Sequence, residues 1–303
     1  MYRSRIQAEL TLAECIVGLL LNYRDALRSV ICIRSLFDEG IEHVVVWDNS
    51  ADDGLSAQAI CEAYAEDHRV QVHVSDENLG FAAGVNHGLK LCATQLRATD
   101  VLLINNDAVL LAGALQACMD ASRDRPGAAV ISMDVKHGGQ RQGPMYYQRW
   151  CGLQFKHPAW GAFAYASGSC LWIALRNAPS PLFDEDFFMY GEDCELGWRL
   201  HHRPDAWIHL PRCLVTHEGS AASGLGSPFY ESRMVAAHIL LARKLATNPP
   251  QRLLFYALRI PILLARASLR SMRYRSLEPW RALSAGIRLA SAPQLANDHP
   301  GSQ

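Results

Sequence analysis

Short apolar runs alternate with segments of helical spacing through the first 135 residues, and this alternation constrains the fold more than any other feature. Continuous apolar runs at 16–21, 43–47 and 101–104 predict buried strands. Helical spacing follows the first two of them, at 25–38 and 55–66. Alternating strands and helices form β-α-β units, so the pattern predicts an α/β domain whose parallel sheet is covered by helices on both faces.

Polar residues gather at the points where predicted strands end. The three clusters are the segments 48–54, 78–86 and 105–107. In open α/β sheets, ligands bind outside the carboxyl ends of the strands. We therefore expect the three clusters to converge on one ligand-binding crevice.

Two aspartates in these clusters are candidate ligand-binding groups. Asp107 follows an apolar strand, and Mg²⁺ and Mn²⁺ prefer such carboxylate oxygens. Asp48 is placed to accept a hydrogen bond from a base imide or a ribose hydroxyl. Both also have structural interpretations, since the segment 105–107 fits an Asx-turn and Asp48 fits a helix N-cap.

The segment 184–193 interleaves acidic residues with aromatic ones, and the aromatic residues favour burial. A carboxylate held beside them is partly desolvated, which raises its pKa toward that of a useful general base. Glu192 and Asp193 equally suit the first turn of a helix, where the helix dipole favours negative charge. His217 follows a short apolar strand and is either a ligand or a structural histidine.

Five segments, in this order, resemble the family 2 glycosyltransferases. They are Asp48 to Gly54, Asn78 to Gly88, Leu103 to Asp107, Phe183 to Leu200 and Val215 to Ser220. The pattern is closest to the rhamnosyltransferase-like and galactofuranosyltransferase-like members. The resemblance implies a GT-A fold, which is Rossmann-like with a mixed, mainly parallel sheet flanked by helices. It also implies an inverting transfer of a sugar from a nucleoside-diphosphate donor to a hydroxyl.

The resemblance further implies roles for individual residues. Asp193 matches the proposed general base, which Glu192 would support. Asp107 matches the last residue of a D-x-D-type motif for Mg²⁺ or Mn²⁺, although Asn105 stands at its first position. His217 matches a further metal ligand of some relatives. The implied donor-binding residues, with Asp48 at the nucleobase, are Asn22, Tyr23, Asp48, Asn49, Asn78, Gly80, Phe81, Asn86 and Asn106.

Residues 136–165 show little periodicity and are expected to form a long loop, of a kind that is usually functional. By resemblance, this region selects the acceptor, for which we expect a cell-surface glycan such as O-antigen on a lipid carrier. Flat aromatic faces suit sugar rings, but they equally suit shielding the crevice from water. Arg199 has either an acceptor-binding or a structural role. The acceptor-binding candidates are Trp150, Trp160, Tyr190 and Arg199.

The end of the chain differs from the body in charge. Residues 251–303 hold eight arginines against Glu278 and Asp298, a balance of +6, so the remainder sums to −7 for a net charge of −1. Arginines interrupt the apolar run too often for a membrane-spanning helix. We expect a helix over 251–290 to lie on an anionic membrane surface, or else to pack on the domain. Four of the arginines recur every seven residues: Arg252, Arg259, Arg266 and Arg273.

We expect a catalytic domain over 1–228, with a nucleotide-sugar half at about 14–135 and an acceptor half at about 136–228. A basic helical region follows at 229–303. The nine cysteines include no C-x-x-C pair, and no export signal is visible, so a reducing cytoplasmic setting fits, peripheral to the inner face of the membrane. No nucleic-acid partner is expected.

The preferred donor is dTDP-rhamnose, by resemblance alone, ahead of UDP-hexoses and UDP-galactofuranose. One alternative function is a nucleotide-sugar-binding subunit that is inactive because Asn105 replaces the first aspartate of the metal motif. Another is a nucleotidyltransferase that makes the sugar nucleotide. That chemistry, like dinucleotide binding, calls for a glycine-rich loop after the first strand, and the sequence has none there.

Overall fold

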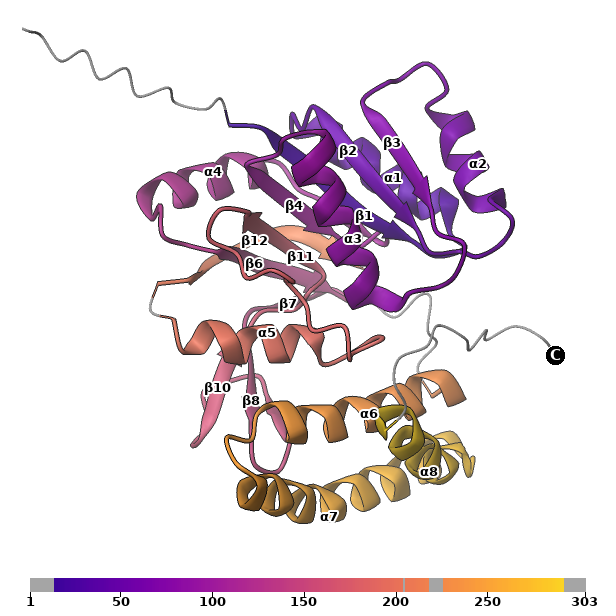
Figure 1. Ribbon diagram of the computed structural model, residues 1–303, viewed down its shortest axis with the longest axis vertical. Helices are drawn as coiled ribbons and strands as arrows, with labels where there is room; N and C mark the ends of the chain where they lie inside the picture. Colours follow the sequence, from indigo (N-terminus) through magenta and orange to yellow (C-terminus); the bar gives the residue numbers. More distant parts are fainter. Residues whose placement is uncertain (1–13, 204, 218–225, 292–303) are drawn as a thin grey trace, which may run out of the picture.

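A computed structural model describes residues 14–203, 205–217 and 226–291. Within these ranges, nine strands form one large sheet flanked by helices (Figure 1). The strand order is β3-β2-β1-β4-β11-β6-β12-β5, with β7 paired to β6. The helices lie on both faces of this sheet, as the sequence predicts.

The first four strands are parallel and confirm the predicted alternation. Three helices connect them, and each follows the strand before it in the chain. Parallel strands buried on both faces need apolar residues at nearly every position, which is why β1, β2 and β4 are nearly continuous apolar runs. β3, at the edge of the sheet, is only partly buried and alternates valine with polar residues. The elements in chain order are β1 (Ile16–Asn22), α1 (Ala26–Asp38), β2 (His43–Asp48), α2 (Leu55–Ala63), β3 (Val70–Val74), α3 (Gly80–Gln95) and β4 (Asp100–Ile104).

The second part of the sheet is mixed. β11 (Cys170–Ala174) runs antiparallel to both of its neighbours, β4 and β6 (Val130–His137). β12 (Trp207–His217) is parallel to β6 and antiparallel to β5 (Ala108–Leu110). This arrangement confirms a mixed, mainly parallel sheet.

Alternate residues of the strands supply two separate cores. Leu20 of β1 packs on the face covered by α1, α2 and α4 (Ala114–Asp124). Leu19 packs on the other face, under α3 and α5 (Glu192–His201). α3 approaches the sheet closely because Gly84 faces it: a Cβ there would lie 2.8 Å from the Leu21 side chain.

The prediction of a long loop over 136–165 is wrong. This region holds the end of β6, the short β7 (Gln140–Gln142) and a separate three-stranded antiparallel sheet in the order β10-β8-β9. Each strand is so short that its two-residue alternation is hard to recognise in the sequence. The strands of the small sheet are β8 (Met145–Gln148), β9 (Gln154–Phe155) and β10 (Ala162–Tyr165).

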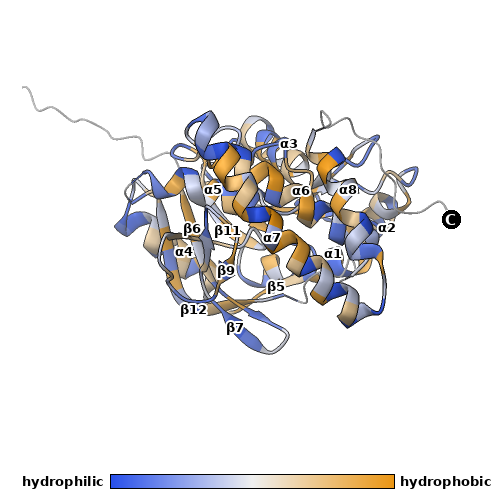
Figure 2. Ribbon diagram, turned by 90° about the horizontal axis from the view of Figure 1, so that it is seen from below, coloured by the Kyte–Doolittle hydropathy of each residue, from blue (hydrophilic) through white to orange (hydrophobic). Residues whose placement is uncertain are grey.

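Three helices follow the sheet and share a third core with the small sheet. They are α6 (Pro228–Lys244), α7 (Pro249–Tyr274) and α8 (Glu278–Ser291). Tyr147 of β8 and Phe255 of α7 are both buried in this core. Figure 2, seen from below, shows α7 across the near side of the molecule, with many apolar residues along it. In the described part of the chain, no helix is long and apolar enough to span a membrane.

Candidate active site

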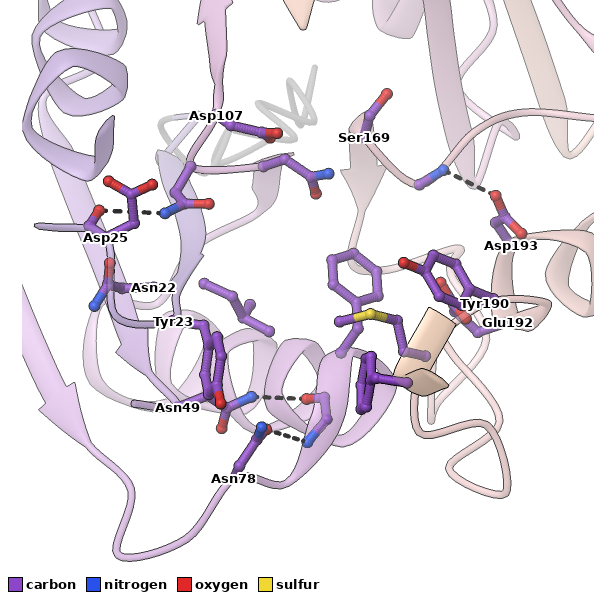
Figure 3. A pocket seen from close by; sticks show the side chains of 18 of the residues that line it. Asn22, Tyr23, Asp25, Asn49, Asn78, Asp107, Ser169, Tyr190, Glu192 and Asp193 are labelled. Atoms are coloured by element: carbon purple, nitrogen blue, oxygen red, sulfur yellow. Dashed lines mark hydrogen bonds between the residues drawn. The ribbon is translucent and has the colours of Figure 1, made fainter. Parts of the chain in front are cut away.

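A cavity of about 580 Å³ opens at the carboxyl ends of β1 and β4 (Figure 3). The start of α3, the loop between β10 and β11, the start of α5 and the first residues of α6 complete its wall. The polar clusters that follow β2, β3 and β4 in the sequence each contribute to it, as expected. Its lining combines apolar side chains with a few polar ones, which is typical of ligand-binding sites.

The floor beside β1 and β2 is a buried hydrogen-bond network. Asn22 donates from Nδ2 to Asp48 Oδ1 at 2.8 Å and to Ser50 Oγ at 3.1 Å. It also accepts from Ser29 Oγ at 2.8 Å. Asn22, Asp48, Ser50 and Ser29 are all 0% exposed, so these bonds replace the water that the groups lost on burial. The network fixes the ends of two strands and the start of α1.

The next part of the wall joins the start of α3 to residues 183–191, which precede α5. Asn49 donates to the carbonyl of Gly80 at 2.8 Å, and Asn78 accepts from the Gly80 amide at 2.9 Å. Gly80 has a φ of +79°, and a Cβ there would overlap the carbonyl oxygen of Phe188. The Phe81 amide donates to that same carbonyl at 2.6 Å. Only glycine therefore permits this contact.

Asp193 and Glu192 lie at the start of α5 and line the cavity. Asp193 accepts from its neighbouring amide, Cys194 N, at 2.7 Å and from Gly168 N at 3.4 Å. Burial raises the pKa of Asp193 above that of an ordinary aspartate. Burial, and then the charge of Asp193, raise the pKa of Glu192. Glu192 Oε2 is buried with no hydrogen-bond partner among the described residues.

Asp107 and His217 meet on the opposite wall. His217 Nε2 lies 3.0 Å from Asp107 Oδ1 and 3.3 Å from Asn105 Nδ2. The Oδ1 atom of Asn105 is buried and has no hydrogen-bond partner in the described part of the chain. An aspartate, a histidine and an orphaned amide oxygen fit a Mg²⁺ or Mn²⁺ ion whose remaining ligands come from a diphosphate. Among the described residues, no group of three His, Cys, Asp or Glu side chains could hold such an ion alone.

Two of the predicted donor-binding residues do not line the cavity. Asp48 lies beneath it, and its Oδ2 atom is buried without a partner among the described residues. Asn86 instead holds the segment 183–191 that precedes α5: its side chain donates to the carbonyl of Phe183 at 2.8 Å and accepts from the amide of that residue at 3.1 Å. The predicted donor residues that do line the cavity are Asn22, Tyr23, Asn49, Asn78, Gly80, Phe81 and Asn106.

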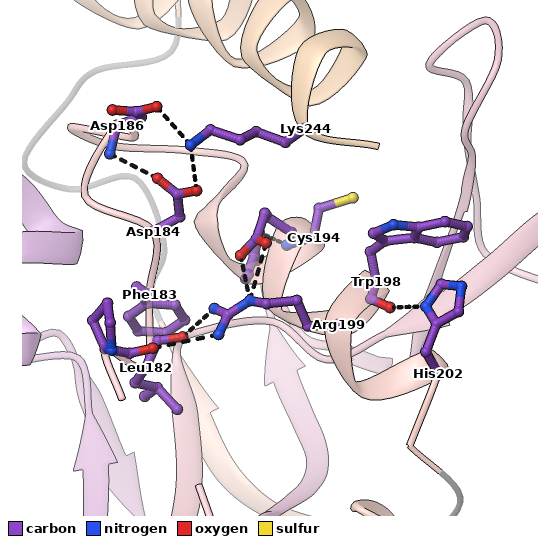
Figure 4. Close-up of polar contacts among 12 residues, drawn as sticks. Leu182, Phe183, Asp184, Asp186, Cys194, Trp198, Arg199, His202 and Lys244 are labelled. Atoms are coloured by element: carbon purple, nitrogen blue, oxygen red, sulfur yellow. Dashed lines mark hydrogen bonds and ion pairs between the residues drawn. The ribbon is translucent and has the colours of Figure 1, made fainter. Parts of the chain in front are cut away.

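Only one of the four acceptor candidates, Tyr190, lines the cavity. Arg199 pairs with Glu195 at 2.9 Å and donates to the carbonyls of residues 181 and 182 (Figure 4). Trp150 and Trp160 lie beside the small sheet with ring centroids 4.9 Å apart, and neither lines the cavity. The structure therefore gives Arg199 a bracing contact and places the tryptophan pair elsewhere.

The acidic segment 184–193 divides into two parts with different uses. Asp184 and Asp186 both form ion pairs with Lys244 of α6, each at 2.6 Å (Figure 4). This arrangement fixes the segment against the C-terminal helices and leaves Glu192 and Asp193 to face the cavity. Within this one segment, the first acidic residues therefore hold the structure together, and the last two line the cavity.

Several residues that line the cavity are not marked by any functional pattern in the sequence. Asp25 caps α1, which is an ordinary structural role, yet it also lines the cavity. The segments 167–169 and 227–229 reach the cavity from distant parts of the chain. Their small or apolar residues have no distinctive chemistry. Only the tertiary structure brings them to the site.

The mixed sheet, with a cavity at the carboxyl ends of its strands, defines a GT-A fold. The sequence matches the family described as Glycosyl transferase family 2 over residues 16–173, which is more than half of the chain. The chain therefore belongs to glycosyltransferase family 2 and is a glycosyltransferase. No curated protein matches the sequence.

Solved structures of similar fold agree with this assignment. S. aureus TarS 1–349 has a TM-score of 0.54 at 15% identity, over 91% of this chain and 80% of that one. Its complex with UDP-GlcNAc has a TM-score of 0.53 at 16% identity, over 91% and 81%. The mannosyltransferase PcManGT from Pyrobaculum calidifontis, in complex with GDP-Man and Mn²⁺, has a TM-score of 0.53 at 15% identity, over 94% and 77%.

Proposed function

We propose that this enzyme transfers a sugar, with inversion, from a nucleoside-diphosphate donor to a hydroxyl of a glycan acceptor on a lipid carrier. The observation that carries the proposal is one cavity with two chemically different walls. Asp107 and His217 lie on one wall, and Asp193, a carboxylate of raised pKa, lies on the other. The similar structures bind UDP-GlcNAc and GDP-Man, which supports a nucleotide sugar as the donor class. Resemblance favours dTDP-rhamnose.

The diphosphate would lie beside Asp107 and His217, with Asn105 contributing its orphaned amide oxygen. A divalent cation bound there would neutralise the negative charge that grows on the leaving diphosphate. The floor residues Asn22 and Asn49 are held by buried hydrogen bonds, so they would hold the nucleoside in a fixed position without rearranging.

Asp193 is the general base of the proposed reaction. It takes the proton of the acceptor hydroxyl while that oxygen attacks the anomeric carbon of the sugar. The bond from that carbon to the diphosphate breaks as the new one forms, and the diphosphate leaves with the electron pair. Attack from the opposite side inverts the configuration. Burial keeps Asp193 basic, and the charge of Asp193 in turn raises the pKa of Glu192 beside it.

Thermal unfolding with dTDP, UDP, GDP and CDP, each with and without Mn²⁺, tests the donor site. A ligand at about a hundred times its Kd adds about 2.7 kcal/mol to the free energy of unfolding, which raises Tm by several degrees. We expect one nucleotide to stabilise the protein, more so with metal, and Asp107→Ala to remove the contribution of the metal. If no nucleotide shifts Tm of the folded protein, the proposed donor site is wrong.

The next test uses the sugar conjugate of the nucleotide that stabilises the protein. Its turnover distinguishes an active transferase from an inactive sugar-nucleotide-binding subunit. We expect release of the nucleoside diphosphate when an acceptor with a free hydroxyl is present. Binding without any release, across lipid-linked and free glycan acceptors, would favour the inactive subunit. dTDP-rhamnose, UDP-galactofuranose and UDP-GlcNAc are the first donors to compare.

A further inference from the structure

Three arginines of α7 face the protein. They are therefore not part of an arginine stripe that faces lipid. Arg259 is 2% exposed and donates to the Tyr147 hydroxyl at 2.9 Å and to the carbonyl of Arg149 at 2.6 Å. Arg266 and Arg270 pair with Glu231 of α6, a carboxylate that is fully buried, at 2.7 Å and 2.5 Å. These three arginines attach α7 to the rest of the molecule.

The opposite face of α7, with the adjoining part of α8, is apolar and exposed. Leu253 and Leu269 are 68% and 67% exposed, although side chains of this type are usually buried. Soluble monomers rarely expose contiguous apolar patches of this kind unless the patch binds something. The outer apolar face consists of Leu253, Leu254, Leu258, Ile260, Leu264, Leu269, Met272, Leu277, Trp280 and Ile287.

The exposed charged residues of α7 and α8 are almost all positive. α7 and α8 together contain one acidic residue, Glu278, and it pairs with Arg281 at 2.7 Å. Glu231 is buried and paired with Arg266 and Arg270, so it does not offset the charge of the exposed arginines. The exposed arginines of the two helices are Arg252, Arg273, Arg275, Arg281 and Arg288.

We propose that the outer apolar face of α7 and α8 docks onto a lipid bilayer that contains anionic lipid. Leucines, a methionine and a tryptophan would enter the boundary between head groups and acyl chains, and the arginines would contact lipid phosphates. A second copy of this chain fits less well, because both copies of the face would carry the same excess of exposed arginines. A bilayer supplies apolar depth and negative charge together.

The position of the face suits an enzyme that works at a surface. α6 lies between α7 and the sheet (Figure 1), and its N-cap Ser227 and its first residues Pro228 and Phe229 line the cavity. α6 and α7 are joined by the buried pairs of Glu231. Docking would thus hold the cavity one helix layer from the lipid surface. The docking itself does not depend on the transfer reaction.

Flotation with lipid vesicles tests the docking. We expect the full chain to bind vesicles of phosphatidylcholine and phosphatidylglycerol at 3:1, and to bind pure phosphatidylcholine vesicles far less. High salt should weaken the binding, since it screens the arginines. Leu253→Glu with Leu269→Glu should abolish binding. Arg252→Gln with Arg288→Gln should lower the partition coefficient about fivefold for each arginine.

A matched control comes from the opposite end of the molecule. Leu27 and Leu55 are 73% and 67% exposed on α1 and α2, so Leu27→Glu with Leu55→Glu adds the same charge at equal exposure. This control should bind vesicles like the native chain. Circular dichroism and Tm verify that each variant is folded.

Three outcomes would overturn the proposal. The first is a folded native chain that does not bind the anionic vesicles. The second is equal loss of binding in the control and in the leucine variant of α7. The third is a native dimer that Leu253→Glu with Leu269→Glu converts to a monomer without changing vesicle binding, as measured by light scattering. None of these outcomes depends on whether the enzyme turns over a nucleotide sugar.

Discussion

The floor of the cavity and the wall that holds Glu192 and Asp193 differ in how their polar groups are satisfied. On the floor, Asn22 uses both its donor and its acceptor atoms within a buried network, in which one oxygen, Asp48 Oδ2, has no partner among the described residues. On the other wall, Glu192 keeps one buried oxygen without a partner in the described part of the chain, and burial raises the pKa of both Glu192 and Asp193. Satisfied groups give a rigid binding surface, whereas under-satisfied carboxylates stay basic. The comparison predicts that the hydrogen bonds of the floor stabilise the fold, whereas the buried carboxylates Glu192 and Asp193 destabilise it.

The largest expected effect is on turnover in Asp193→Asn. Removing a general base lowers the rate by about 10² to 10⁴-fold, while nucleotide binding persists because the amide leaves the floor unchanged. Tm should not fall, since the variant removes a buried charge. Initial rates with saturating donor measure the loss. Asp120→Asn, at an exposed position of α4, is the control and should keep full activity.

The same base predicts a pH dependence of kcat/KM. Asp193 must be ionised to accept a proton, so activity falls as pH drops through its pKa. Because burial raises that pKa, the loss should begin at a higher pH than the ordinary value for aspartate, about 4. A rate profile that stays flat down to pH 4, with the protein still folded, would contradict the assignment of Asp193.

A large effect on stability is expected for Gly80→Ala, at the junction of the two walls. The positive φ and the overlap with the Phe188 carbonyl together should cost about 2 to 4 kcal/mol. Urea denaturation measures the free energy of unfolding. Gly127→Ala is the matched control, because a Cβ there meets nothing within 4 Å. Equal stability of the two variants would show that the junction tolerates movement.

The smallest effect is a gain in stability in Glu192→Gln. With its pKa raised in the folded state, Glu192 destabilises the protein as pH rises from the ordinary glutamate range through the raised pKa. At pH 8 the free energy of unfolding of the variant should therefore exceed that of the native chain by roughly 1 to 3 kcal/mol, seen as a higher Tm. At pH 4, where Glu192 is protonated in the folded state, the two should unfold at nearly the same Tm. Glu66→Gln, at an exposed position, serves as the control. A lower Tm at pH 8 would mean that the ionised carboxylate contributes to folding.

The proposed catalytic carboxylates show how far a motif can predict a site. Glu192 and Asp193 line the cavity because their helix begins at a glycine, Gly191, with a φ of +96°. Their acidic neighbours Asp184 and Asp186 have the same chemistry but pair with Lys244. Composition cannot separate these two pairs of acids, since the difference lies in contacts with residues 50 or more positions away.

By itself, the sequence determined the elements whose patterns are local. The apolar runs of β1, β2 and β4 and the polar clusters beyond them are properties of neighbouring residues. Such patterns predict the parallel half of the sheet and most of the floor of the cavity. Local pattern is sufficient there because strands buried on both faces accept little but apolar side chains.

The tertiary structure alone decided the orientation of the C-terminal helices and the composition of the far wall. The seven-residue spacing of arginines predicts one shared face, but it does not reveal that Arg259 lies against β8 and Arg266 against Glu231. Nor does any local sequence pattern predict that the segments 167–169 and 227–229 line the cavity. Helical periodicity fixes which residues lie together on a face, whereas long-range packing fixes what that face meets.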